Sequence, residues 1–256
     1  NGYWSEWGCW GECKIGTRQR HRNCNDPVPT GWGNYCLGNH TETEKCGAAG
    51  QDIVFALDTS SCIGESNYNS MLDQVNSVIQ CLDLDTGSGP LTKVRVGIEL
   101  FNEEPVALKH LNNFVLPTAP YPHGGGTNHA AGLSFAHDTM FTEPNGDRPS
   151  VPNTVVVVSD GKTTYPIPAA IAATAAKNDG IKIIAIGVGN GTHLQGIVSD
   201  PSTDLHTTDN FCSIASDLKK IFNCTENPAE SERIRMECTA AKAYDDSEAK
   251  ISPQEG

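Results

Sequence analysis

The spacing of apolar residues divides the chain into two parts. From Gln51 onward, short apolar runs alternate with amphipathic segments, which is typical of a parallel sheet covered by helices on both faces. This pattern predicts strands over 52–58, 94–101, 153–160, 181–188 and near Leu205, and helices over 66–82, 128–140, 166–178 and 211–222. Segment 104–108 can return as an antiparallel edge strand. The expected fold class is therefore α/β, with a doubly wound, mostly parallel sheet.

The first 47 residues follow neither the helical nor the strand period. They are rich in Gly, Trp and Cys, and so short a segment cannot bury enough apolar area to fold without disulfides or stacked side chains. Residues 47–50, Gly-Ala-Ala-Gly, are typical of a short linker. We therefore predict a small module over 1–47, a larger domain over 51–224, and an acidic tail over 225–256.

Cysteine usage indicates an oxidising compartment. The chain holds ten cysteines, half of them in the first 46 residues, which a reducing cytosol does not favour. Three N-x-[ST] sequons, at Asn39, Asn190 and Asn223, agree with a secretory route and are candidate glycosylation sites. No apolar run approaches the roughly 18 residues of a bilayer span, so no membrane insertion is expected. We expect a secreted, extracellular protein.

The charge excludes one class of partner. The net charge is −13, and residues 51–256 carry the whole excess because residues 1–50 are balanced. A nucleic acid is not expected as a partner, since its phosphates repel an acidic surface, whereas divalent cations and basic partners are attracted.

Tryptophans and arginines alternate with a fixed spacing in the first module. Three indoles lie three residues apart and three guanidiniums occupy alternate positions of a predicted strand: Trp4, Trp7, Trp10, Arg18, Arg20 and Arg22. Because alternate strand residues share one face, the two sets can interleave as a cation–π ladder in place of a core.

Residues 3–46 resemble a thrombospondin type 1 repeat, through W-x-x-W-x-x-C and the downstream R-x-R. The resemblance implies the disulfides Cys24–Cys36 and Cys9–Cys46, and mannosylation at Trp4 or Trp7. The last cysteine of the family is missing, which leaves Cys13 without its usual partner. The row Arg18, Arg20, Arg22 has two interpretations, a binding site for sulfated glycans or guanidiniums used in stacking, and the second is favoured.

Polar residues follow three segments of the larger domain. They are Asp58-Thr-Ser60-Ser-Cys62, Gly125-Gly126-Thr127-Asn128 and Val158-Ser159-Asp160-Gly161. The carboxyl ends of parallel strands meet at one edge of a sheet, so these carboxylates and hydroxyls can surround a hard divalent cation.

This arrangement resembles the metal-ion-dependent adhesion site of von Willebrand factor type A domains, D-x-S-x-S with a distant Thr and a distant Asp. The resemblance implies that Asp58, Ser60, Thr127 and Asp160 hold Mg²⁺ or Ca²⁺, and that a carboxylate of the partner completes the coordination. Cys62 replaces the second Ser, which removes one direct ligand because thiols bind these cations poorly. In the alternative interpretation, these polar residues only satisfy loop amides and cap helices.

The remaining cysteines lie at the ends of predicted helices. Cys62 and Cys81 lie at opposite ends of the first helix and cannot reach each other. In the resembled fold the last helix runs beside the first, which implies Cys62–Cys212 and Cys81–Cys224. By elimination, Cys13 pairs with Cys238, or both form links between chains in a disulfide-linked oligomer. Two cross-links between these helices would fix the domain in one affinity state.

An enzyme is not expected. A triad of Ser60, His129 and Asp160 lacks the G-x-S-x-G turn, and no H-E-x-x-H is present. The leading hypothesis is a secreted, non-enzymatic adhesion or matrix protein that binds a matrix protein, a cell-surface receptor or a glycan. The alternatives are a mineral-associated, Ca²⁺-binding matrix component and a secreted hydrolase.

Overall fold

The computed structural model describes most of both parts of the chain. The described residues are 2–11, 17–31, 33–45, 50–85, 91, 93–113, 115–161, 163–189, 191–224, 236 and 238–239. Among them, no helix is both long enough and apolar enough to cross a membrane. The expected acidic tail over 225–256 lies outside the described residues except for Met236, Cys238 and Thr239.

The N-terminal module has a two-stranded antiparallel sheet, β1 (Thr17–His21) and β2 (Thr41–Lys45). Its indoles and guanidiniums alternate as expected. The Cζ atom of Arg20 lies 4.5 Å and 5.1 Å from the ring centroids of Trp10 and Trp7, and that of Arg22 lies 4.3 Å and 4.6 Å from those of Trp7 and Trp4. This cation–π ladder replaces an apolar core.

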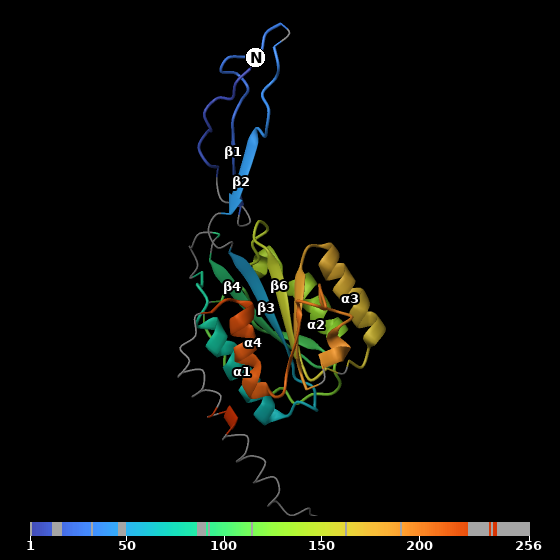
Figure 1. Ribbon diagram of the computed structural model, residues 1–256. Helices are drawn as coiled ribbons and strands as arrows, with labels where there is room; N and C mark the ends of the chain where they lie inside the picture. The colour runs from blue at the N-terminus through green and yellow to red at the C-terminus, as the bar shows by residue number, and fades with distance from the viewer. Residues whose placement is uncertain are drawn as a thin grey trace, which may run out of the picture.

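The larger domain is built on a six-stranded sheet in the order β5-β4-β3-β6-β7-β8, in which β5 alone is antiparallel (Figure 1). The strands are β3 (Gln51–Asp58), β4 (Val94–Phe101), β5 (Pro105–Lys109), β6 (Asn153–Ser159), β7 (Lys182–Val188) and β8 (Leu205–Thr208). Apolar runs form the inner strands because both faces of the sheet are covered. The expected α/β class is confirmed.

Two helices cover each face of the sheet, as Figure 1 shows. The elements α1 (Glu65–Ile79) and α4 (Ile214–Ile221) pack against Ile53, Phe55 and Leu57 of β3. The elements α2 (His129–Phe135) and α3 (Pro166–Asn178) pack against Val54 and Ala56, the β3 residues that point to the opposite face of the sheet. The side-chain alternation of one strand therefore supplies both halves of the core.

Two predicted helices differ from the structure in their internal geometry. The segment 128–140 is not one α-helix, because α2 is followed by a π-helical turn over Ala136–Met140. The segment 211–222 begins with a 3₁₀ turn, Phe211–Ser213, before α4. Further 3₁₀ turns lie at Glu143–Asn145 and Gly191–Leu194. The periods of α, π and 3₁₀ turns are too close to separate in a few residues of sequence.

The structure contains two of the expected disulfides, Cys24–Cys36 and Cys81–Cys224. The second joins the region just after α1 to the region just after α4.

The three other expected pairs are wrong. Cys212 bonds to Cys238, so neither Cys62–Cys212 nor Cys13–Cys238 forms, and Cys62 is free and exposed. Cys9 is also free and exposed, which excludes Cys9–Cys46. Cys13 and Cys46 lie outside the described residues.

A buried ion pair fixes the amino end of β3. Asp52 is fully buried, and its carboxylate accepts hydrogen bonds from Arg148 Nε (3.0 Å), Nη2 (2.6 Å) and the backbone N–H (2.9 Å). Arg148 Nη2 also donates to the carbonyl oxygen of Lys93 at 2.9 Å, which ties the start of β4 to the same group.

We predict that Arg148→Met destabilises the protein by about 3 kcal/mol or more, because it leaves Asp52 buried without its cation. Urea unfolding followed by circular dichroism measures this loss. The matched control is Lys220→Met, which removes an exposed ion pair with Asp217 and should cost less than about 1 kcal/mol. Equal effects of the two variants would contradict the assignment.

Candidate cation site at the carboxyl edge of the sheet

Three loops meet at the carboxyl edge of the central strands. The loop after β3 is bonded to the loop before α2, because Ser61 N and Oγ both donate to the Gly125 carbonyl, at 3.2 Å and 3.1 Å. The loop before α2 is bonded to the loop after β6, because Thr164 N donates to the Thr127 carbonyl at 2.8 Å and Thr127 N donates to Thr164 Oγ1 at 3.2 Å. The predicted site residues thus belong to loops that are hydrogen-bonded to one another.

Asp58 is the buried centre of this edge. Its Oδ1 accepts from Ser60 N at 2.9 Å, and its Oδ2 accepts from Ser159 Oγ at 2.6 Å. Ser159 Oγ in turn lies 3.0 Å from His129 Nε2 and accepts from Gly161 N at 3.1 Å. Because the only hydroxyl proton of Ser159 is directed to Asp58, we assign the proton of His129 to Nε2, which makes it a donor.

Burial sets the ionisation of both end groups of this chain. It raises the pKa of Asp58 to about 6, and the charge of Asp160 adds to the effect, while the hydrogen bonds from Ser159 and Ser60 oppose it. Burial lowers the pKa of His129 to about 4, so the imidazole is neutral at pH 7. The carboxyl groups of Asp58 and Asp160 therefore lie close enough to repel each other, and a cation at this edge would stabilise both in their charged form.

The Ser60 hydroxyl has an unused binding capacity. Ser60 is 1% exposed, and its Oγ makes no hydrogen bond to any described group, although it lies near enough to the Asp58 carboxyl to lower its pKa. Leaving a buried hydroxyl unpaired costs about 1–3 kcal/mol, so such a group indicates a ligand. Thr127 is 7% exposed and Asp160 is half-buried. These four oxygen-bearing side chains suit a hard divalent cation.

Cys62, which replaces the second Ser of D-x-S-x-S, is exposed, whereas Asp58 and Ser60 are buried. Within the described part of the chain, no three side chains of His, Cys, Asp or Glu already form a metal-binding group. A cation at this edge would therefore depend on hydroxyl as well as carboxylate oxygens.

The residues considered for catalysis do not form a triad. His129 bonds to Ser159, not to Ser60, and Ser159 lies between the imidazole and Asp58. In a catalytic triad the histidine lies between the carboxylate and the hydroxyl, so this order provides no general base for a nucleophile.

Sequence analysis did not assign Ser159 and Tyr121 to the site. Ser159 immediately precedes Asp160 at the end of a buried strand, and that position could have suggested an inward hydroxyl. Tyr121 comes from an irregular segment, and its hydroxyl donates to the Ser60 carbonyl at 2.7 Å. No sequence pattern predicts this contact.

The candidate modification and glycan-binding residues differ in their surroundings. Asn39 and Asn223 are exposed, and Asn190 lies outside the described residues. Trp4 and Trp7 are half-buried in the ladder. Arg20 also pairs with Glu42 at 2.6 Å, and Arg22 Nε donates to the Asn39 carbonyl at 3.0 Å, which leaves these two guanidiniums little capacity for a glycan. Nothing is described of the Arg18 side chain.

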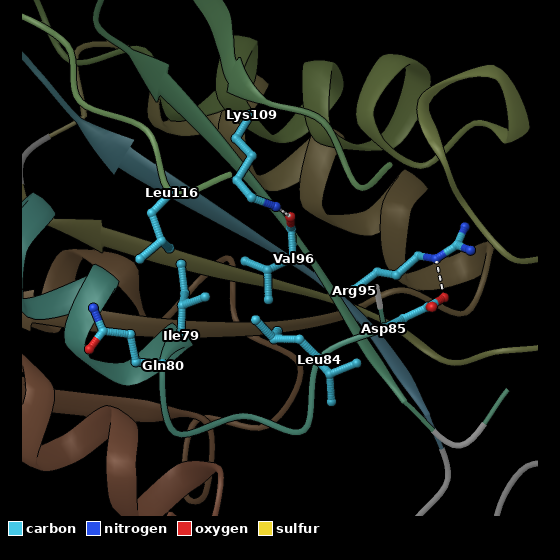
Figure 2. A pocket seen from close by; sticks show the side chains of 9 residues that line it. Ile79, Gln80, Leu84, Asp85, Arg95, Val96, Lys109 and Leu116 are labelled. Atoms are coloured by element: carbon cyan, nitrogen blue, oxygen red, sulfur yellow. Dashed lines mark hydrogen bonds and ion pairs between the residues drawn. The ribbon is translucent and has the colours of Figure 1, made fainter. Parts of the chain in front are cut away.

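A hollow lies near the amino end of β4, between the end of α1 and β5 (Figure 2). Its lining is mostly apolar, with Ile79, Leu84, Val96 and Leu116. Lys109 is buried there and donates to the Val96 carbonyl, and burial lowers its pKa to about 8. The hollow holds no group of polar side chains that converge on a ligand, so the carboxyl edge is the stronger candidate site.

Comparison with known families agrees with this fold. The model of the von Willebrand factor type A domain matches residues 52–223, and that of the thrombospondin type 1 domain matches residues 2–50. The chain belongs to the von Willebrand factor type A domain family and carries a thrombospondin type 1 domain before it.

Similar proteins include matrix components. The chain is 30% identical to the collagen alpha-4(VI) chain of Mus musculus over 66% of its own length and 8% of that protein, and 27% identical to matrilin-1 of Gallus gallus over 72% and 38%. It therefore spans a minor part of these relatives. A structure of proximal thread matrix protein 1 from the mussel byssus, with a zinc-occupied MIDAS motif, is 24% identical with a TM-score of 0.61, covering 68% of this chain and 48% of that one. At this identity the likeness shows the fold alone.

We predict that Asp58 makes the cation-free protein less stable as pH rises. A raised pKa in the folded state means that its contribution is fully present below the unfolded value near 4 and is lost as pH rises through about 6. In the presence of a chelator, Asp58→Asn should therefore be more stable than the wild type at pH 7.5, by about 3 kcal/mol for a shift of two units. The difference should shrink towards pH 4 in urea unfolding, and a difference independent of pH would contradict the assignment.

Proposed function

We propose that this chain is part of a secreted, non-enzymatic adhesion or matrix protein that binds an acidic group of a matrix partner through a divalent cation. Asp58, Ser60, Thr127 and Asp160 would hold the cation, and a carboxylate of the partner would complete its coordination. The observation that carries the proposal is the Ser60 hydroxyl, which is buried beside the Asp58 carboxyl and has no hydrogen-bond partner among the described residues.

The arrangement of the domain supports binding at this edge. The first module joins the domain through Gly50, at the amino end of β3, whereas Asp58 ends the same strand (Figure 1). The edge that carries the site is therefore at the end of the strand opposite the connection, which supports binding of a partner there. The similarity to collagen VI and matrilin-1 supports extracellular partners of the matrix class, and the disulfides support secretion.

The residues around the cation have separate tasks under this proposal. Ser159 and His129 hold the Asp58 carboxyl in one orientation by a chain of hydrogen bonds. Tyr121, through the Ser60 carbonyl, fixes the loop that carries the Ser60 hydroxyl. The cation, when bound, supplies the positive charge that two neighbouring carboxylates require. No bond in the partner is broken, so no general acid or base is needed.

We predict that Thr127→Val abolishes the rise in melting temperature that Mn²⁺ produces, because the variant keeps the shape of the side chain and loses its hydroxyl. Binding to immobilised collagen in Mn²⁺ should fall to the level measured in EDTA. The control is Thr174→Val on α3, whose exposed hydroxyl bonds to the carbonyl of Ala170 and should leave both measurements unchanged. A normal Mn²⁺ response of Thr127→Val would count against the proposed site.

A second part of the proposal concerns regulation. Since Cys62–Cys212 does not form, a single bond, Cys81–Cys224, links the end of α4 to the end of α1. We propose that this bond restricts sliding of α4 along the sheet and holds the domain in one affinity state.

We predict that Cys81→Ser/Cys224→Ser lowers stability by about 3–5 kcal/mol, because the bond closes a separation of 143 residues. Hydrogen exchange of α4 should not respond to Mn²⁺ and collagen in the wild type, and should respond in the double variant. If α4 responds in the wild type as well, the bond does not restrain the helix.

A further inference from the structure

Cys62 is a free thiol at a position where the family has a hydroxyl. Six of the described cysteines form disulfides, while Cys62 and Cys9 are free and exposed. Cys62 lies in the turn that follows Ser60, and this turn is fixed at both sides. Ile63 N donates to the Ser60 carbonyl at 3.0 Å, and Ser61 N donates to the Gly125 carbonyl.

The thiol and the buried carboxyl both influence Tyr121. Burial raises the pKa of Tyr121, and the charges of Asp58 and Cys62 add to this effect, so both groups lie close to the same phenol. The Tyr121 hydroxyl donates to the Ser60 carbonyl at 2.7 Å. Tyr121 is thus bonded to the residue that lies two positions before Cys62, in the same turn.

A second observation indicates a ligand at the same place. The Ser60 hydroxyl is buried, acts on the pKa of Asp58 and has no hydrogen-bond partner in the part of the chain that the structure describes. A cation bound to Ser60 Oγ would lie within reach of the side chain at position 62. In this chain that side chain offers sulfur.

Sulfur changes which cation the site prefers. Mg²⁺ and Ca²⁺ require oxygen ligands, whereas a thiolate favours Zn²⁺ and similar ions, at a Zn–S distance of about 2.3 Å. We propose that Cys62 is a direct ligand and makes the site selective for a thiophilic divalent cation, of which Zn²⁺ is the leading example. This inference rests on the proposed function, because it assigns the cation that the same site uses.

Binding is a simple exchange. The Cys62 thiol loses its proton to water as the sulfur binds the ion, so one proton is released and no oxidant or reductant is needed. Asp58, Cys62 and Asp160 do not already form a group of three ligands. The exposed Cys62 side chain turns inward about χ1, which has three staggered positions.

The test uses Co²⁺, a spectroscopic substitute for Zn²⁺, on the whole disulfide-bonded chain handled without oxygen. The wild type should show a thiolate-to-metal charge-transfer band, and Cys62→Ser should lose it. Cys9→Ser is the matched control, because it removes the other free, exposed thiol and should keep the band. Isothermal titration should show that Cys62→Ser weakens Zn²⁺ binding at least about tenfold and strengthens Mg²⁺ binding, since a hydroxyl replaces the thiol.

The possible results distinguish failure of the Cys62 proposal from failure of the proposed function. If Zn²⁺ and Mg²⁺ bind the wild type through Thr127 and Asp160, and Cys62→Ser alters neither affinity nor spectrum, the thiol is not a ligand and the proposed function stands. If no cation binds the wild type or Cys62→Ser, both proposals are wrong. A Cys62–Cys62 disulfide between chains of the native protein also overturns the inference, because a disulfide sulfur is not a thiolate.

Discussion

The buried carboxyl of Asp58 constrains the rest of the carboxyl edge. A carboxyl group without water must receive hydrogen bonds, and it receives them from Ser60 N, in the loop after β3, and from Ser159 Oγ, at the end of the neighbouring strand β6. Ser159 is oriented by His129 at the start of α2. One desolvated group therefore fixes three separate segments of the chain relative to one another. The Ser60 hydroxyl has no hydrogen-bond partner among the described residues.

The sheet order explains why this group is where it is. Strand β3 lies between β4 and β6, so its carboxyl end is surrounded by other loops and its side chains alternate between two covered faces. Apolar residues fill β3 up to Leu57, and the first polar residue after them is Asp58. Stability and candidate function thus occupy different ends of one strand. The Asp52–Arg148 pair fixes the amino end, and the Asp58 network organises the carboxyl end.

The sequence predicted the sheet well because its strands are continuous apolar runs with polar ends. Strand β4 and helix α3 have the predicted bounds, and Pro166, at the first position of α3, marks its start. Disulfide pairing could not be predicted as well, since Cys62 and Cys212 both precede helices that pack together, and only the fold shows that Cys238 reaches Cys212. The contact of His129 with Ser159 depends on how α2 packs against β6, which no local pattern contains.

The corrected disulfides change how the affinity of the site would be controlled. A second bond, from Cys62 to Cys212, would have restrained the amino end of α4 and consumed the Cys62 thiol. Instead, Cys212 is bonded to Cys238, Cys224 beyond the carboxyl end of α4 is bonded to Cys81, and the thiol of Cys62 remains free. Under the proposed function, a restrained helix leaves little room for control by helix movement. Under the same proposal, the affinity for the partner then depends mainly on which cation is bound, because sulfur and oxygen ligands select different ions.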